Sequence, residues 1–254
     1  MKLELKNVCL SYGGKTVLQE VSLSVDGGIT VLLGRNGAGK TSLLRCLTGE
    51  KRDFGGEITV DGTDVRRLQP RDRARLVGYL PQELPTPKVT VAELVAFGRS
   101  PYLPLTGKLR DADEAAVEKA MELTGVSCLS GRLVDSLSGG ERQKAFLAMV
   151  LAQETPLVVL DEPTAQLDAA ARLELCALLK TLRDRTGRHF LVVMHELPEA
   201  LVLADRVVVL HEHTMAFDGT PEACLRQNIP QTCFGITLTG NAETGFAVKP
   251  GSIA

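Results

Sequence analysis

The sequence contains no tryptophan, and only 4% of its 254 residues are aromatic. Proteins that bind single-stranded nucleic acid by stacking need aromatic side chains, so this class is excluded. Basic residues are not in excess either, since 29 Lys and Arg are matched by 31 Asp and Glu, for a formal net charge of -2. A general nucleic-acid binder would carry excess positive charge. We therefore expect no nucleic-acid partner.

Long hydrophobic runs are also absent. The longest, such as residues 146–152 and 190–194, are far shorter than the roughly 18–20 residues of a membrane-spanning helix. The first ten residues, MKLELKNVCL, alternate charged and apolar side chains and lack the apolar core of a signal peptide. We expect a chain that does not cross a membrane by itself.

Cysteine pairs with metal-ligand spacing are missing. The six cysteines stand at positions 9, 46, 128, 176, 224 and 233, and none forms a CxxC pair. Such scattered residues are typical of reduced core thiols in a cytoplasmic chain. They indicate neither a disulfide framework nor a zinc site.

The chain has the composition of a folded globular protein, with 44% hydrophobic and 24% charged residues. Alternating segments at 2–10 and 17–25 predict an N-terminal β part, which we expect to be antiparallel. Short apolar strands then alternate with helices, which predicts an α/β domain with a mostly parallel sheet covered on both faces. The expected strands are 30–33, 56–60, 77–80, 157–160, 190–194 and 206–210, and the expected helices are 40–48, 139–153, 169–183 and 198–204.

Residues 83–136 interrupt this α/β pattern. They contain a helix with the capping box Thr90-x-x-Glu93 and a second helix that starts at Asp111 and stops at Gly125. With the helix that follows, they form an expected helical subdomain at about 83–152.

The subdomain is inserted into a domain that we expect to span residues 1–220. Residues 221–254 then form a C-terminal extension with a short helix and a hairpin around Gly240-Asn241, to which we assign no chemistry. The arginines at 71, 73 and 75 are expected on a solvated face rather than in a ligand site.

A phosphate-binding pattern lies between a predicted strand and a predicted helix. G-x-x-x-x-G-K-[ST] is matched by Gly34-Arg35-Asn36-Gly37-Ala38-Gly39-Lys40-Thr41, and Ser42 follows. Glycines let backbone N–H groups converge on phosphate oxygens, and the helix N-terminus adds positive potential. Lys40 can reach the outer phosphates, and the Thr41 hydroxyl can bind Mg²⁺.

Two carboxylates follow a second buried strand. The segment 157–160 is apolar and ends in Asp161 and Glu162. This position places Asp161 at the carboxyl edge of the sheet, near the phosphate loop, where it can hold Mg²⁺. Glu162 points elsewhere because successive side chains alternate, so it can act as general base toward a water molecule.

The third motif is Leu137-Ser138-Gly139-Gly140-Glu141. Ser138 and Glu141 form a capping box that starts a helix. A helix N-terminus with two glycines also exposes N–H groups suited to a γ-phosphate. Because the chain already has one phosphate loop, we expect this surface to complete a site on a second copy.

Together, these motifs make residues 2–220 resemble the nucleotide-binding subunit of an ABC transporter, with Walker A at 34–41, the signature at 137–141 and Walker B at 157–162. The resemblance implies a P-loop NTPase core that hydrolyses ATP with Mg²⁺.

Further positions match that family one by one. Tyr12 resembles the aromatic residue that stacks on adenine, or else is an ordinary strand residue. Gln82 resembles the Q-loop glutamine, which senses Mg²⁺ and couples to the membrane partner, or is a solvated loop residue. His195 resembles the switch histidine that contacts the γ-phosphate, although a lone histidine is usually structural. Residues 165–168 resemble the D-loop, with Gln166 where serine is usual.

The resemblance also implies a head-to-tail homodimer that encloses two ATP molecules. Thr41, Gln82 and Asp161 would bind Mg²⁺, and the catalytic residues would be Glu162, His195, Lys40 and Gln82. The nucleotide would contact Tyr12, all of residues 34–42 and, from the other copy, Ser138, Gly139 and Gly140.

A subfamily is indicated by residues 78–82 and 91–102, which resemble importers of iron–siderophores, haem and cobalamin. In such importers the helical subdomain receives the permease, and an extracytoplasmic binding protein supplies the cargo. The chain would then lie peripherally on the cytoplasmic face of the cell membrane.

Two alternatives remain open. One is a soluble ABC-type ATPase acting in iron–sulfur cluster assembly, which would lack an exposed apolar groove at 83–136. The other is a nucleotide-dependent binding module that hydrolyses poorly. The intact Glu162 and His195 argue against the second alternative.

Overall fold

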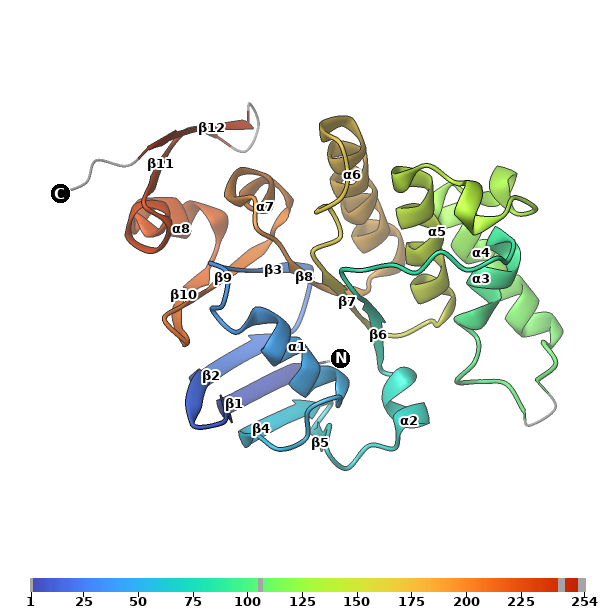
Figure 1. The fold of residues 1–254 in the computed structure, drawn as a ribbon, viewed down its shortest axis with the longest axis horizontal. Coiled ribbons are helices and arrows are strands. Elements are labelled where there is room, and N and C mark those ends of the chain that lie inside the picture. Colours follow the sequence, from blue (N-terminus) through green and yellow to red (C-terminus); the bar gives the residue numbers. More distant parts are fainter. Residues whose placement is uncertain (1, 105–106, 242–244, 251–254) are drawn as a thin grey trace. The chain divides into compact units, whose positions relative to one another are not determined.

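The computed structural model of the chain describes residues 2–104, 107–241 and 245–250 (Figure 1). It divides the chain into two compact units. Unit 1 contains Met1–Leu68 and His189–Ala254, and unit 2 contains Gln69–Arg188. The helical subdomain expected at about 83–152 falls within unit 2, which also includes neighbouring strands and helices.

Unit 1 contains an antiparallel sheet in the order β2-β1-β4-β5, in agreement with the predicted N-terminal β part. In β1, a register shift follows Leu5, and Asn7 adopts a φ of 49°. The shift moves Val8 and Leu10 onto the buried face already occupied by Leu3 and Leu5. The strands are β1 (Leu3–Tyr12), β2 (Lys15–Val25), β4 (Gly55–Val60) and β5 (Thr63–Asp64).

A second sheet of unit 1 is centred on β3 (Ile29–Gly34). Strand β3 pairs in parallel with β8 (His189–Val193) and with β9 (Arg206–His211). Strand β10 (Thr214–Gly219) pairs antiparallel with β9. Every residue of β3 is buried, as expected for an apolar strand with neighbours on both sides. The sequence pattern predicts β3, β8 and β9 but not β10, which lacks a clear alternation.

Helix α1 (Lys40–Thr48) packs against β2 and β3 (Figure 1). Its apolar face buries Leu43, Leu44 and Leu47. As predicted, the helix ends at Gly49, which adopts a φ of 75° and donates its N–H to the Cys46 carbonyl oxygen.

The remaining elements of unit 1 follow β8 along the chain. Helix α7 (Leu197–Leu203) packs against β3, and α8 (Pro221–Arg226) packs against β9 and β10. A π-helical turn, η3 (Pro230–Phe234), precedes the antiparallel strands β11 (Ile236–Asn241) and β12 (Gly245–Pro250). These strands confirm the hairpin predicted around Gly240-Asn241, although residues 242–244 and 251–254 lie outside the described part of the chain.

Unit 2 combines a parallel strand pair with a group of helices. Strands β6 (Val77–Leu80) and β7 (Leu157–Asp161) pair in parallel, and helix α5 packs against β6, α3, α4 and α6. The helices are α2 (Pro70–Ala74), α3 (Val91–Phe97), α4 (Asp111–Thr124), α5 (Gly139–Ala152) and α6 (Ala169–Thr186), with 3₁₀ turns η1 (Ser127–Leu129) and η2 (Val134–Ser136).

The helix starts of the insert are largely as predicted. Thr90 accepts a hydrogen bond from the Glu93 N–H and donates its own N–H to the Glu93 carboxylate, at 3.3 and 2.7 Å. Helix α4 runs over Asp111–Thr124 with Gly125 at its C-cap, as predicted, and its N-cap is Arg110, whose N–H donates to Asp113 at 3.1 Å. Asp113 takes this role because it is buried and fixed by a 2.9 Å ion pair with Arg99.

Arginines also organise the loop that follows α3. Arg99 lies over the Tyr102 ring, with its guanidinium carbon 4.2 Å from the ring centroid. Arg71 and Arg75 donate to the Pro101 carbonyl oxygen at 2.8 and 3.0 Å. Helix α2 is exposed as predicted, but Arg71 within it and Arg75 at its C-cap support this loop rather than only contacting solvent.

The cysteines are free, as predicted, and four of them are buried. Burial raises the pKa of Cys46 to about 11 and the pKa of Cys224 to about 12. Cys128 is exposed, which corrects its assignment to the core, because it lies on the 3₁₀ turn at Ser127–Leu129.

The close contact between α3 and α5 at Gly98 gives a test of this packing. A Cβ atom at Gly98 would collide with the Met149 carbonyl oxygen, and backbone cannot rotate away. We expect Gly98→Ala to lower the free energy of unfolding by about 1–3 kcal/mol, measured by urea denaturation. Gly131→Ala is the control, because nothing lies within 4 Å of a Cβ there. Equal stability of the two variants would contradict the packing.

Candidate functional site

The phosphate loop begins where β3 ends, at Gly34. Because β3 is buried between two parallel strands, it holds this loop at the carboxyl edge of the sheet in unit 1. A Cβ at Gly34 would lie 2.6 Å from the Leu210 carbonyl oxygen of β9. Only glycine therefore fits at this exit from the sheet.

Two further glycines shape the loop in different ways. Gly37 has a φ of 82°, and nothing lies within 4 Å of a Cβ built on it. Gly39 has a φ of 104°, and a Cβ there would lie 2.6 Å from the Val17 carbonyl oxygen. Glycine is therefore needed at position 37 for its left-handed backbone conformation. At position 39 it is needed for the same reason and also because β2 approaches closely.

Helix α1 presents its N-terminus to the loop. The N-cap is Gly39, and in this fully described stretch no side chain caps the first turn. The Lys40 side chain is buried and donates to the Gly34 carbonyl oxygen at 2.8 Å and to that of Arg35 at 3.4 Å. The amides of the first turn and the Lys40 ammonium together form a cradle for phosphate oxygens.

Tyr12 and His195, both predicted from the sequence, belong to unit 1 as well. Tyr12 ends β1 with 42% of its surface exposed, and its ring centroid is 5.6 Å from the Lys51 ammonium. His195 is exposed two residues beyond Val193, which pairs with Leu32 of β3. Since Gly34 lies two residues beyond Leu32, His195 and the phosphate loop share one edge of the sheet.

The C-terminal extension touches the phosphate loop, which the sequence does not predict. The Arg35 guanidinium donates to the Phe234 carbonyl oxygen at 3.1 Å. The residues are 199 positions apart, and no local pattern predicts their contact.

In unit 2, Gln82 and Glu162 lie together. Each stands two residues beyond the paired residues Leu80 and Leu160, so the parallel strands bring them to one edge. The Gln82 amide nitrogen donates to the Glu162 carboxylate at 2.6 Å. The predicted Q-loop and Walker B residues are therefore neighbours.

Glu162 has an unusual backbone conformation. Its φ is 51°, a left-handed value that costs free energy in a residue with a side chain. This turn follows β7 directly and leaves Glu162 only 9% exposed. Asp161, the residue before it, accepts a hydrogen bond from the Tyr79 hydroxyl at 3.4 Å, a contact the sequence does not predict.

The signature helix begins as predicted. The Ser138 hydroxyl accepts from the Glu141 N–H at 3.3 Å, and the Ser138 N–H donates to the Glu141 carboxylate at 2.9 Å. Asp168 caps α6 in the same way, by accepting from the Ala171 N–H at 2.9 Å. An open groove of about 480 Å³ joins the signature to the D-loop and is lined by Ser138, Gly139, Gly140, Glu141, Lys144, Gln166, Leu167, Asp168, Ala170, Ala171 and Glu174.

The predicted magnesium ligands are a hydroxyl, an amide oxygen and a carboxylate, from Thr41, Gln82 and Asp161. Hard oxygen atoms of this kind suit Mg²⁺. In the described ranges, no group of three or more His, Cys, Asp or Glu residues could hold a metal ion. Thr41 lies in unit 1 next to the phosphate cradle, and Gln82 and Asp161 lie in unit 2 at the ends of β6 and β7.

None of the helices in the described residues has the length and apolar character needed to cross a membrane.

Comparison with known proteins places these features in context. Residues 18–165 match the family model described as ABC transporter. The ferric enterobactin transport ATP-binding protein FepC of Escherichia coli (strain K12) is 38% identical over 237 residues, covering 92% of this chain and 88% of that protein. The iron(3+)-hydroxamate import ATP-binding protein FhuC of Bacillus subtilis (strain 168) is 34% identical, covering 92% and 88%.

Solved structures agree with the sequence relatives. A transporter described as being of the metal-chelate type, in an inward-facing conformation, matches with a TM-score of 0.83 and 25% identity, covering 98% of this chain and 96% of that chain. A nucleotide-free ATP-binding cassette from an ABC transporter matches with a TM-score of 0.81 at 22% identity, covering 91% and 96%, which shows the shared fold.

The capping box of the signature helix predicts a pH effect. The Ser138 N–H lowers the pKa of Glu141 below its ordinary 4.5. Since the folded pKa lies below the unfolded one, the stabilisation is present above pH 4.5 and is lost as the pH falls through the folded pKa. We expect Glu141→Gln to reduce the loss of unfolding free energy in acid, measured by denaturation at several pH values.

The exposed Glu118 on α4 supplies the control for this measurement. Glu118→Gln should keep the acid dependence of the wild-type chain. If Glu141→Gln and the wild type lose stability in parallel below pH 4.5, the capping role of the Glu141 charge is wrong.

Proposed function

The chain belongs to the ABC transporter family as an ATP-binding ATPase, and from this membership we propose that it powers a membrane importer of iron–siderophore, haem or cobalamin-type metal chelates. The relatives described above are ATP-binding proteins of ferric enterobactin transport and of iron(3+)-hydroxamate import. They give no support to the alternative of a soluble iron–sulfur assembly ATPase.

The contact between Gln82 and Glu162 is the observation that carries the catalytic part of the proposal. The two side chains meet at 2.6 Å at the end of a parallel strand pair, and Glu162 is buried in a strained turn. A carboxylate fixed in this way can orient a water molecule and accept its proton. The intact Glu162 and its partner argue against a module that binds nucleotide without hydrolysing it.

Hydrolysis then follows from positioning and charge neutralisation. Water forms a bond to the γ-phosphorus while Glu162 takes its proton, and the bond from that phosphorus to the leaving ADP oxygen breaks. Lys40 and the amides of the phosphate loop neutralise charge on the outer phosphates, and His195 contacts the γ-phosphate. Thr41, Gln82 and Asp161 would hold Mg²⁺, which would supply further positive charge.

A second copy of the chain would complete each site. Ser138 and Gly139 are exposed at the start of α5, where the helix dipole favours an anion, and they open onto a groove of about 480 Å³. We assign Ser138, Gly139 and Gly140 to the γ-phosphate of ATP bound by the partner copy. The resulting head-to-tail dimer closes on ATP and opens after hydrolysis, which gives two states for driving transport.

The helical subdomain would bind the permease. Among the described residues, Phe97 and Leu133 are two of the few large apolar side chains that are exposed, at 54% and 47%. Both belong to the insert at 83–136. We propose that a permease helix covers them, which would hold the chain peripherally at the cytoplasmic face of the membrane, with the cargo delivered by an extracytoplasmic binding protein.

Co-purification tests the importer assignment. Tagged chain isolated from detergent-solubilised membranes should retain a polytopic membrane protein, and Phe97→Ser/Leu133→Ser should release it while ATP hydrolysis by the isolated chain persists. The exposed Leu173 of α6 gives the control variant, Leu173→Ser. If wild-type chain isolates without any membrane protein, the chain is not an importer subunit.

Glu162→Gln tests the base assignment. The variant keeps the side-chain shape but cannot accept the proton, so turnover should fall by about 100-fold or more while ATP binding is retained. ATP should then trap a dimer that is visible by light scattering. Lys40→Ala, which removes the ammonium of the phosphate cradle, should instead lose ATP binding. Wild-type turnover in Glu162→Gln would remove Glu162 from the base role.

A further inference from the structure

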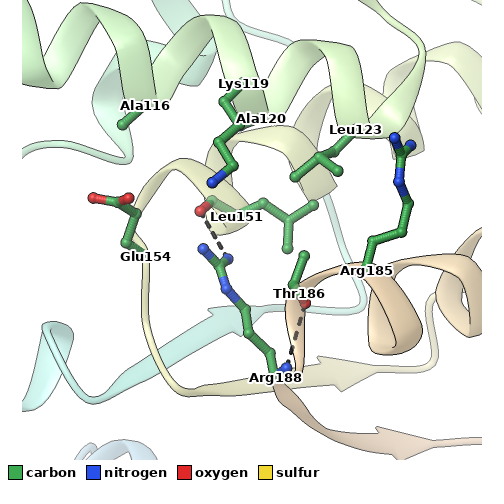
Figure 2. Close-up of a pocket in the computed structure, with 9 residues that line it drawn as sticks. All are labelled: Ala116, Lys119, Ala120, Leu123, Leu151, Glu154, Arg185, Thr186 and Arg188. Carbon is green, nitrogen blue, oxygen red and sulfur yellow. Dashed lines mark hydrogen bonds between the residues drawn. The ribbon is translucent and has the colours of Figure 1, made fainter.

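A cavity of about 150 Å³ lies in unit 2 and contains none of the nucleotide motifs (Figure 2). Three segments form it: residues 116–123 of α4, the end of α5 with Glu154 just beyond it, and the end of α6 with Arg188 just beyond it. The lining residues are Ala116, Lys119, Ala120, Leu123, Leu151, Glu154, Arg185, Thr186 and Arg188.

Positive charge dominates this cavity. It is lined by Lys119, Arg185 and Arg188 but by a single carboxylate, that of Glu154. Figure 2 shows Lys119 and Arg188 directed toward one another, with the Leu151 carbonyl oxygen beside them. Like charges in such a position repel, and a concave site screens them less than open water does.

The carboxylate of Glu154 is already engaged. Its Oε2 atom binds the Arg99 guanidinium at 2.7 Å. Within residues 2–104, 107–241 and 245–250, Lys119, Arg185 and Arg188 form no ion pair. The cavity therefore carries an excess of positive charge that the Glu154 carboxylate only partly offsets.

Arg188 is held in place by its surroundings. Its Nη1 atom donates to the Leu151 carbonyl oxygen at 2.8 Å, and its backbone N–H donates to the Thr186 hydroxyl at 3.4 Å. The Thr186 hydroxyl in turn donates to the Leu182 carbonyl oxygen at 2.6 Å. The hydrogen bond to the Leu151 carbonyl oxygen uses one of the five N–H hydrogens of the Arg188 guanidinium, so other donors remain for a ligand.

The electrostatics of Arg188 point the same way. Burial lowers the pKa of Arg188, and the negative charge of Glu154 only partly opposes this effect. A cation that is desolvated without full compensation gains from a bound anion.

We propose that this cavity binds a small oxyanion of the phosphate class, either inorganic phosphate or a compact phosphate monoester. The guanidinium group of Arg188 presents a donor fork that matches phosphate oxygens, and Lys119 adds a point charge beside it, whereas the Arg185 side chain extends past Leu123 and adds positive charge from farther away (Figure 2). A cavity of about 150 Å³ is the size that holds one benzene-like molecule, which excludes a nucleotide. The site is thus distinct from the phosphate loop at Gly34–Thr41.

Thermal unfolding of the full chain with increasing inorganic phosphate tests the site, with potassium chloride holding the ionic strength constant. The Lys40→Ala background weakens phosphate binding at the nucleotide site. A ligand that binds the folded state raises the unfolding temperature in a saturable way. The double variant Lys119→Gln/Arg185→Gln changes two exposed side chains and should keep its fold. If the double variant unfolds, the single variant Lys119→Gln is measured in its place.

We expect the double variant to need about tenfold more phosphate for the same rise in unfolding temperature. Lys108→Gln/Lys180→Gln is the charge-matched control in unit 2, outside the cavity, and should titrate like its parent. The proposal is wrong if the cavity variant and the control show the same dependence of unfolding temperature on phosphate. It is also wrong if phosphate raises the unfolding temperature of the parent no more than potassium chloride does.

Discussion

The placement of β3 between β8 and β9 is the constraint on which the nucleotide site of unit 1 depends. All six residues of β3 are buried, and parallel hydrogen bonds on both sides fix its register. The strand therefore places Gly34 at a fixed position on the sheet edge. The same strand register places His195 at that edge. Without this fixed exit, neither the glycine cradle nor the buried Lys40 would face a common point.

Unit 2 uses the same device with different chemistry. The parallel pair β6–β7 carries Gln82 and Glu162 two residues past matched positions, so the side chains meet without any contact that is local in sequence. The parallel strands thus place two residues that are 80 positions apart within hydrogen-bonding distance of each other. The left-handed turn at Glu162 adds strain, which a buried neighbourhood can sustain.

The sequence predicts a large part of this arrangement. Motif spacing identifies the phosphate loop, the two carboxylates and the signature cap, because each depends on local chemistry such as glycine backbones or Ser138 with Glu141. Contacts such as Tyr79 with Asp161 and Arg35 with Phe234 depend on register and on chain packing far away in sequence, which no local pattern encodes. The capping contact of α4 is of the same kind, since the Asp113 carboxylate that accepts from the Arg110 N–H is held by a tertiary ion pair with Arg99.

The pairing of β3 also has a consequence for biosynthesis. A ribosome completes residues 29–34 long before it makes the flanking strands at 189–193 and 206–211. At ordinary rates of translation this delay lasts on the order of ten seconds. During that time an apolar strand with both edges unpaired emerges beside a half-made β part, and such edges attract other chains. The nascent chain should therefore depend on chaperone protection until its last third has been translated.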